Sequence, residues 1–187
     1  TTLFRSVREW RLRHDVVEKD YVLGWALWAV GSDEELNRTW CFKGGTSLKK
    51  CFVETYRFSE DLDFSVLPGG PASAEEVLPR IRAALERASE ASGIEFNVRE
   101  PQFRTMTSGG FTDGRIYYRG PRHAPQVASI KLDISMKEAV LRPTVLRPIF
   151  HAYPDELPAP ALVRCYGFDE VLAEKIRALH ERERPRD

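Results

Sequence analysis

The spacing of hydrophobic and polar residues divides the chain into helical and extended segments. Positions that repeat with the period of a helix predict four helices. They span residues 15–37, 46–52, 73–92 and 168–182. Shorter runs rich in Val, Ile, Phe and Tyr, separated by Gly, Pro and Asp, predict strands. These span residues 39–43, 56–66, 94–103, 114–120, 127–136 and 144–150.

Local signals mark several boundaries between these elements. Ser73, followed three residues later by Glu76, is typical of a capping box at the start of a helix that runs to Gly93. Residues 31–33, Gly-Ser-Asp, interrupt the first helix near its end. Because helices and strands do not alternate strictly, the expected fold class is α+β, with a mixed sheet flanked by helices rather than a doubly wound parallel sheet.

Composition narrows the class of protein. With 187 residues, of which 42% are hydrophobic, the chain can form one domain with a sizeable core. Its formal net charge is zero, so any attraction to nucleic acid has to come from local patches. The longest apolar run, residues 21–30, is about half of the roughly 20 residues that span a bilayer, so we expect a buried helix and no membrane contact. The three cysteines have unpatterned spacings, which indicates reduced core thiols in a cytoplasmic protein.

Two of the predicted strands carry aspartates on one face. Side chains alternate along a strand, so Asp61 and Asp63 in FSEDLDFSV share the face opposite Leu62. In SIKLDIS, Asp133 likewise lies opposite the apolar positions. If the two strands are neighbours, the three carboxylates form a cluster able to hold two divalent cations, because Mg²⁺ prefers carboxylate oxygens. A solvated sheet face readily explains one acid, but it explains the pair, the third acid and the preceding glycine turn less well.

That turn consists of Gly44, Gly45, Thr46 and Ser47. Glycines ahead of a helix N-terminus let a ligand approach closely, and the free backbone N–H groups together with the helix dipole favour phosphate. The segment lacks the spacing of a Walker A loop, and the chain contains no GxGxxG. Such a turn alone often has no ligand, and the DxD strand that follows makes a phosphate site the better interpretation.

Taken together, these motifs resemble the AbiEii/AbiGii toxin family of nucleotidyltransferases, which belongs to the DNA polymerase β-like superfamily. The resemblance rests on GGTSL, RFSEDLDFS, the later LDIS, and LAEKIRAL followed by RERPRD, and it covers about residues 15–187. It implies a polymerase-β-like mixed sheet, with an N-terminal helical segment over 1–38, the catalytic core over 39–167 and a truncated C-terminal helical region over 168–187. Family members usually continue beyond this RD, and the chain also begins with Thr-Thr, so we expect a fragment.

The resemblance also implies an activity. The protein would be a Mg²⁺-dependent nucleotidyltransferase that moves a nucleotide from an NTP to an acceptor, with RNA, especially the tRNA 3′ end, as the leading candidate. Asp61 and Asp63 would bind two Mg²⁺ ions, with Mn²⁺ as an alternative, and Asp133 would complete the site and help to deprotonate the attacking hydroxyl. The turn at residues 44–47 would hold the triphosphate. The chain would be the toxin of a toxin–antitoxin pair acting in phage abortive infection, with a DNA-binding antitoxin encoded nearby.

Three basic residues are candidates for contact with the nucleotide phosphates. In the last helix, Lys175 lies in the middle of an apolar stripe, where a lysine needs an anionic partner or has to reach solvent. The stripe consists of Phe168, Val171, Leu172, Ile176 and Leu179. The resemblance places this lysine in the active site, and pairing with a structural acid is the alternative. Arg57 shares a strand face with Asp61, and Lys43 directly precedes the glycines.

Other interpretations stay open at this point. Basic and aromatic residues interleave over residues 103–123, which suits RNA binding, but a solvated hairpin around TDGR explains them equally well. A two-metal nuclease could use the same acids, although DISMK has Ser where an ExK motif has its acid and the glycine turn would have no role. A non-catalytic RNA- or protein-binding module predicts neither tight divalent binding nor stabilisation by NTPs.

Overall fold

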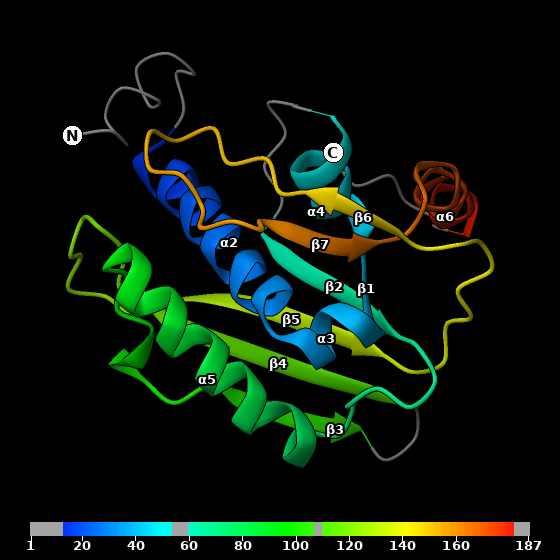
Figure 1. The fold of residues 1–187 in the computed structure, drawn as a ribbon, viewed down its shortest axis with the longest axis horizontal. Coiled ribbons are helices and arrows are strands. Elements are labelled where there is room, and N and C mark those ends of the chain that lie inside the picture. Colours follow the sequence, from blue (N-terminus) through cyan, green and yellow to red (C-terminus); the bar gives the residue numbers. More distant parts are fainter. Residues whose placement is uncertain (1–12, 54–59, 107–109, 182–187) are drawn as a thin grey trace.

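The computed structural model describes residues 13–53, 60–106 and 110–181, which form one sheet flanked by helices (Figure 1). Within these residues the sheet has seven strands in the order β3-β4-β5-β2-β1-β7-β6. The strands are β1 Trp40–Lys43, β2 Asp61–Val66, β3 Gln102–Met106, β4 Phe111–Tyr118, β5 Ala128–Ser135, β6 Val145–Pro148 and β7 Leu162–Cys165. The pairs β2/β5 and β1/β7 are parallel and the others are antiparallel, so the predicted α+β fold with a mixed sheet is confirmed.

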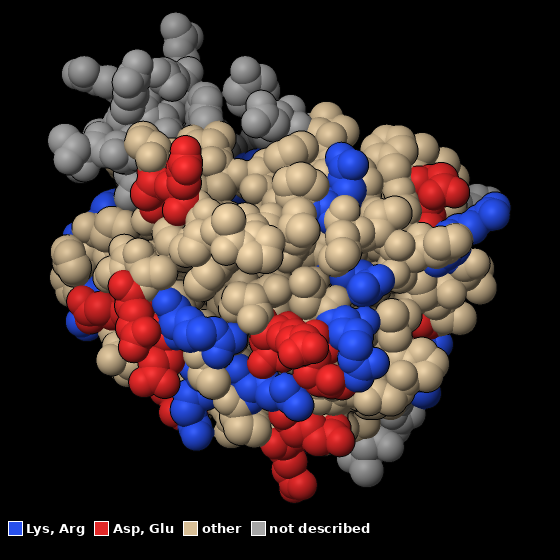
Figure 2. All heavy atoms as spheres, viewed as in Figure 1, with Lys and Arg blue, Asp and Glu red and all other residues tan. Residues whose placement is uncertain are grey.

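Two long helices lie across the same face of the sheet (Figure 1). The helical elements are α2 His14–Ser32, α3 Glu34–Thr39, α4 Gly44–Ser47, the π-helix η1 Leu48–Phe52, α5 Ala74–Ser92, the 3₁₀-helix η2 Phe96–Val98 and α6 Phe168–Glu181. The covering pair is α2 and α5, which also pack against each other. Lys and Arg alternate with Asp and Glu on this helix-covered side (Figure 2), so it is not a uniformly basic surface.

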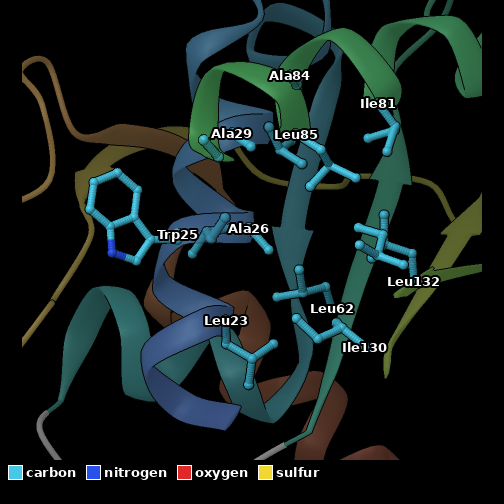
Figure 3. Packing of buried hydrophobic residues seen from close by; sticks show 14 of the residues in the cluster. Leu23, Trp25, Ala26, Ala29, Leu62, Ile81, Ala84, Leu85, Ile130 and Leu132 are labelled. Atoms are coloured by element: carbon cyan, nitrogen blue, oxygen red, sulfur yellow. The ribbon is translucent and has the colours of Figure 1, made fainter. Parts of the chain in front are cut away.

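The main core lies between this helix pair and the sheet (Figure 3). The apolar side chains that meet there are Leu62, Ile130 and Leu132 from the sheet, Leu23, Ala26 and Ala29 from α2, and Ile81, Ala84 and Leu85 from α5. Burying each large aliphatic side chain stabilises the fold by about 1.5–3 kcal/mol. Because strand side chains alternate, filling this face with apolar residues directs Asp61, Asp63 and Asp133 to the opposite face.

Several predicted boundaries are confirmed. Ser73 caps α5 and accepts from the Glu76 N–H, while the Glu76 carboxylate accepts from the Ser73 N–H. The interruption at residues 31–33 divides the predicted first helix into α2 and α3, and Asp33 caps the second by accepting from the Leu36 N–H. The predicted short helix begins earlier than expected, at Gly44, and continues through η1.

One strand prediction was wrong, and so was one of the two interpretations of the segment around TDGR. Residues 96–98 form a 3₁₀-helix instead of a strand, because Phe96 turns inward and is buried beside α5, and β3 starts only at Gln102. β3 and β4 do pair antiparallel, but the turn of this pair does not lie at TDGR, since Asp113 and Gly114 lie inside β4. Glycine is required there for packing: a Cβ at Gly114 would lie 2.3 Å from the Phe103 ring. The short strand β7 was missed altogether.

A buried ion pair fixes the helical run behind the glycine turn. Lys50 Nζ on η1 donates to Asp20 Oδ2 on α2 at 2.9 Å, and Lys49 Nζ donates to Asp20 Oδ1 at 2.7 Å. Tyr153 Oη donates to the same carboxylate at 2.9 Å. Burial opposes ionisation of Asp20, but the charges of the two lysines hold its pKa below the usual value. The segment that follows α4 is therefore tied to the main core.

Two expectations from composition can be compared with the structure. All three cysteines, Cys41, Cys51 and Cys165, are buried and unpaired, as predicted for core thiols. None of the helices in the described ranges combines the length and apolarity needed to cross a bilayer.

Candidate active site

The acidic residues lie in rows across the face of the sheet opposite the main core. Asp63 on β2 is directly paired with Asp133 on β5, and Asp133 is directly paired with Asp113 on β4. Lys43 on β1 extends this row on the other side, since it is paired with Asp63. Neighbouring strands are about 4.8 Å apart, so three carboxylates follow one another at that spacing. Asp61 lies in the adjacent row and is exposed.

The glycine turn lies directly against one of these carboxylates. Gly44 has a φ of 75°, and a Cβ at this position would lie 2.5 Å from Asp63 Oδ2. Only glycine therefore allows this backbone conformation and this close approach together. Thr46 Oγ1 donates to the Asp61 carbonyl at 2.7 Å, and Ser47 Oγ donates to the Gly44 carbonyl at 2.8 Å. Both hydroxyls hold the turn in place, so what the turn can offer an anion is its backbone N–H groups.

The carboxylates disfavour one another's ionisation. Burial, followed by the nearby charge of Asp133, raises the pKa of Asp63 from 3.8 to about 6. Burial also raises the pKa of Asp133, against the opposite effect of Lys131. The Oδ1 atom of Asp133 is buried and has no hydrogen-bond partner among the described residues. A buried, unsatisfied carboxylate oxygen beside a second carboxylate is the arrangement that a bound cation would stabilise.

Two further charged residues on this face of the sheet were missed by sequence reasoning, Asp113 in the row of Asp63 and Asp133 and Lys131 in the adjacent row of Asp61. Lys131 Nζ donates to Asp133 Oδ2 at 2.6 Å and lies 3.8 Å from Asp113 Oδ1. The sequence could have identified Lys131, because the alternation of side chains in IKLD puts Lys131 and Asp133 on the same face of the strand. Asp113 was not counted among the carboxylates, because TDGR was interpreted as a turn rather than as part of a strand.

Lys43, a predicted phosphate contact, lies beside the carboxylates but has a partner of its own. Its ammonium forms an ion pair with Glu138, which also accepts a hydrogen bond from Ser65 Oγ at 3.2 Å. Ser65 Oγ in turn lies 2.7 Å from Tyr166 Oη. Burial lowers the pKa of Lys43, against the raising effect of nearby carboxylates that include Asp63. To contact a phosphate, the Lys43 ammonium would therefore have to give up its ion pair with Glu138.

Comparison with known proteins identifies the family. A family model described as the nucleotidyl transferase AbiEii toxin of type IV toxin–antitoxin systems matches residues 25–187. The chain belongs to this family. The resemblance stated from the motifs is thus confirmed, over a range that begins ten residues later than expected.

The fold of this AbiEii-family chain is similar to that of MenT4, a nucleotidyltransferase toxin from Mycobacterium tuberculosis H37Rv. The TM-score is 0.60 at 22% sequence identity, and the match covers 95% of this chain and 59% of the MenT4 chain. The AbiEii-family chain thus spans about three fifths of the length of that protein. A comparison with curated proteins found no match.

The carboxylate cluster fits a hard divalent cation in its chemistry. Its donors are all oxygen atoms, which Mg²⁺ prefers, and Asp133 Oδ1 is unsatisfied. Within the described parts of the chain, no three His, Cys, Asp or Glu side chains are placed so that they could hold a metal ion together. The Lys131 ammonium instead neutralises Asp133. The AbiEii-family site therefore has suitable ligands, but its side chains have to rearrange to bind a cation.

The remaining predicted phosphate contacts have different outcomes. Arg57 lies outside the described residues. Lys175 is half-buried on α6, which packs against α4, and it has no ion pair or hydrogen bond within the described residues. The apolar stripe around it is not buried as expected: Val171 is 2% exposed, but Phe168 is 47% exposed and Ile176 is 60% exposed. Since most of the stripe faces solvent, burial does not force Lys175 to find an anion.

A cavity of about 410 Å³ lies between residues 137–141 and α6. Its lining includes Glu138, the partner of Lys43, together with Glu174 and Arg177 of α6. This volume is within the usual range of small-molecule sites, which is roughly 300–1,000 Å³. The cavity lies beside the Lys43–Glu138 ion pair and is a candidate space for part of a ligand, although its lining includes none of Asp61, Asp63 and Asp133.

Proposed function

We propose that this AbiEii-family chain transfers a nucleotide from an NTP to an acceptor hydroxyl with the help of Mg²⁺. The observation that carries the proposal is the pairing of Asp63 with Asp133 on neighbouring strands, with the Gly44 turn against Asp63. Asp61 lies on the same face, one row away. Membership of a family described as nucleotidyl transferase toxins supports the same activity.

In the proposed reaction, the oxygen of the acceptor hydroxyl forms a bond to the α-phosphorus of the NTP. The bond from this phosphorus to the bridging oxygen breaks, and pyrophosphate leaves. Asp61, Asp63 and Asp133 are the proposed ligands of two Mg²⁺ ions, with Mn²⁺ as an alternative, and Asp133 also accepts the proton of the hydroxyl. Bound divalent ions supply charge neutralisation at the attacking and leaving oxygens. The backbone N–H groups of residues 44–47 orient the triphosphate.

Basic side chains complete the proposed nucleotide site. Lys175 lies on α6, next to the glycine turn, and is free to reach a phosphate. Lys43 contributes after exchange with Glu138, and Arg57 is retained as a candidate from its sequence position. Such transfers depend mainly on positioning and neutralisation of charge, so no cysteine, serine or histidine nucleophile is required.

For the biological role, we propose RNA, in particular the tRNA 3′ end, as the acceptor. The protein would act as the toxin in the cytoplasm, with an antitoxin encoded nearby as its genetic partner. The family description, which names a type IV toxin–antitoxin system, supports this part of the proposal.

Thermal unfolding with Mg²⁺ and each NTP in turn tests the nucleotide site. A ligand at 100 times its dissociation constant stabilises by about 2.7 kcal/mol, which raises the melting temperature of a chain of this size by roughly 5–11 °C. Asp61→Asn/Asp63→Asn should abolish the shift. The matched control, Glu86→Gln/Glu90→Gln, removes two exposed carboxylates from α5 on the other side of the sheet and should retain it.

The result separates three functions. Stabilisation by Mg²⁺ alone, with no response to any NTP, would favour a two-metal nuclease, and no response to either would favour a non-catalytic binding module. For the transferase, label from an α-³²P NTP should pass to tRNA. Periodate oxidation, which destroys the terminal diol, should block this transfer if the 3′ end is the acceptor.

A further inference from the structure

We propose that Lys131 is a built-in counter-ion of the carboxylate cluster, bound to Asp133 in the metal-free protein and displaced onto Asp113 when a divalent cation binds. This deepens the proposed function, because it concerns how the same carboxylates take up their cation. Asp113 and Lys131 thereby become positioning residues of the site, although neither holds the ion itself.

The structure places both carboxylates of this movement, Asp133 and Asp113, within reach of the Lys131 ammonium. The Lys131 ammonium donates to Asp133 Oδ2 at 2.6 Å, and Asp113 Oδ1 lies 3.8 Å from the same nitrogen. Asp113 and Asp133 are direct partners in the antiparallel β4/β5 pair, so their side chains project from the same face side by side. A small rotation of the lysine side chain transfers its contact from one carboxylate to the other.

Exposure of the side chains allows this movement. The side chains of Lys131 and Asp113 are 41% and 50% exposed, whereas that of Asp133 is only 20% exposed. The lysine and its second partner are therefore able to adjust, while Asp133 is held in place.

Electrostatics explains why the cluster needs such a counter-ion. Asp63 and Asp133 are direct neighbours on a partly buried face, where two like charges repel each other unless a cation lies near them. Lys43, which lies in the same row as Asp63 and Asp133, is paired with Glu138. An ammonium and a divalent ion at Asp133 repel each other, so the two compete for this carboxylate. Asp113 lowers the cost of displacement because the ammonium remains paired.

Titration of the protein with Mn²⁺ alone, followed by the paramagnetic resonance signal of the free ion, tests the inference. Lys131→Met removes the competitor and should bind Mn²⁺ about tenfold more tightly, the factor expected from repulsion between a single and a double charge at about 6 Å in water. The same variant should melt at a lower temperature than the wild type without metal, because the carboxylates lose their counter-ion. Arg115→Met is the matched control. It removes a positive charge from the same face, where Arg115 donates to Ser129, and should change the affinity less than threefold.

A double-mutant cycle tests the role of Asp113. Asp113→Asn should weaken Mn²⁺ binding at least threefold more when Lys131 is present than in the Lys131→Met background. Equal weakening in both backgrounds would overturn the proposed transfer, since Asp113 would then act through its own charge. The inference would also be overturned if Lys131→Met bound Mn²⁺ no more tightly than the wild type, or if neither protein bound Mn²⁺ at millimolar concentration. Because no nucleotide is present, failure of the proposed function would appear separately, as Mn²⁺ binding without any stabilisation by NTPs.

Discussion

Replacing Gly44 by alanine perturbs the closest contact between the glycine turn and the carboxylates. The residue has a φ of 75°, and this left-handed conformation is less favourable for an L-residue by about 1–2 kcal/mol. The new Cβ would also lie 2.5 Å from Asp63 Oδ2, whereas ordinary contacts begin at 3.4 Å. The carboxylate or the turn therefore has to move by about 1 Å, and a misplacement of this size can reduce activity about 100-fold.

Gly93→Ala is the matched control for the backbone effect. Gly93 ends α5 with a φ of 74°, and a Cβ there meets nothing within 4 Å. The backbone effect alone should therefore lower the melting temperature of both variants by about 2–8 °C, which corresponds to 1–2 kcal/mol in a chain of this size. Only Gly44→Ala should also weaken Mn²⁺ binding and the stabilisation by Mg²⁺ with an NTP.

The reasoning is refuted if the two alanine variants bind Mn²⁺ equally well and are stabilised equally by Mg²⁺ with an NTP. Equal metal and nucleotide affinities would mean that contact with Gly44 does not set the position of Asp63. The glycine would then be required only for its backbone conformation.

Three other predictions concern Lys175, the buried ion pair and pH. Lys175→Met should leave the melting temperature without ligand nearly unchanged, because Lys175 has no ion pair or hydrogen bond in the described residues, and should weaken NTP binding about tenfold in calorimetry. Unchanged NTP affinity would remove Lys175 from the site. Asp20→Ala leaves Lys50, which is 2% exposed, without its carboxylate and should lower the free energy of unfolding in urea by about 3–5 kcal/mol. A loss below about 1 kcal/mol would contradict this role of the pair. Because Asp63 has a pKa of about 6 instead of 3.8, the folded protein binds its proton more tightly than the unfolded chain. Relative to Asp63→Asn, the metal-free wild type should therefore lose about 1–3 kcal/mol of stability as the pH rises from about 4 to above 6. Mn²⁺ affinity should instead fall as the pH drops below about 6, and pH-independent differences in both measurements would count against the raised pKa.

Some features of the site follow from local pattern alone. The alternation of side chains along a strand places Asp61 and Asp63 together opposite Leu62, whatever the neighbouring strands are. The capping box at Ser73 and the helical turn after the glycines likewise depend on residues only a few positions apart. These interactions are short in sequence, so the residue order is sufficient to predict them.

The partners of these residues were decided by the tertiary structure. Asp113 lies in TDGR, whose local preference is for a turn, but pairing with β5 and the packing of Phe103 over Gly114 place it in a strand beside Asp133. The pairing of Lys43 with Glu138 joins residues 95 positions apart, and nothing local indicates it. Strand order and register depend on burying the whole apolar face at once, and a shift of one residue would turn every carboxylate inward. The sequence by itself therefore determined which residues carry the chemistry, and the packing of the sheet decided which of them meet.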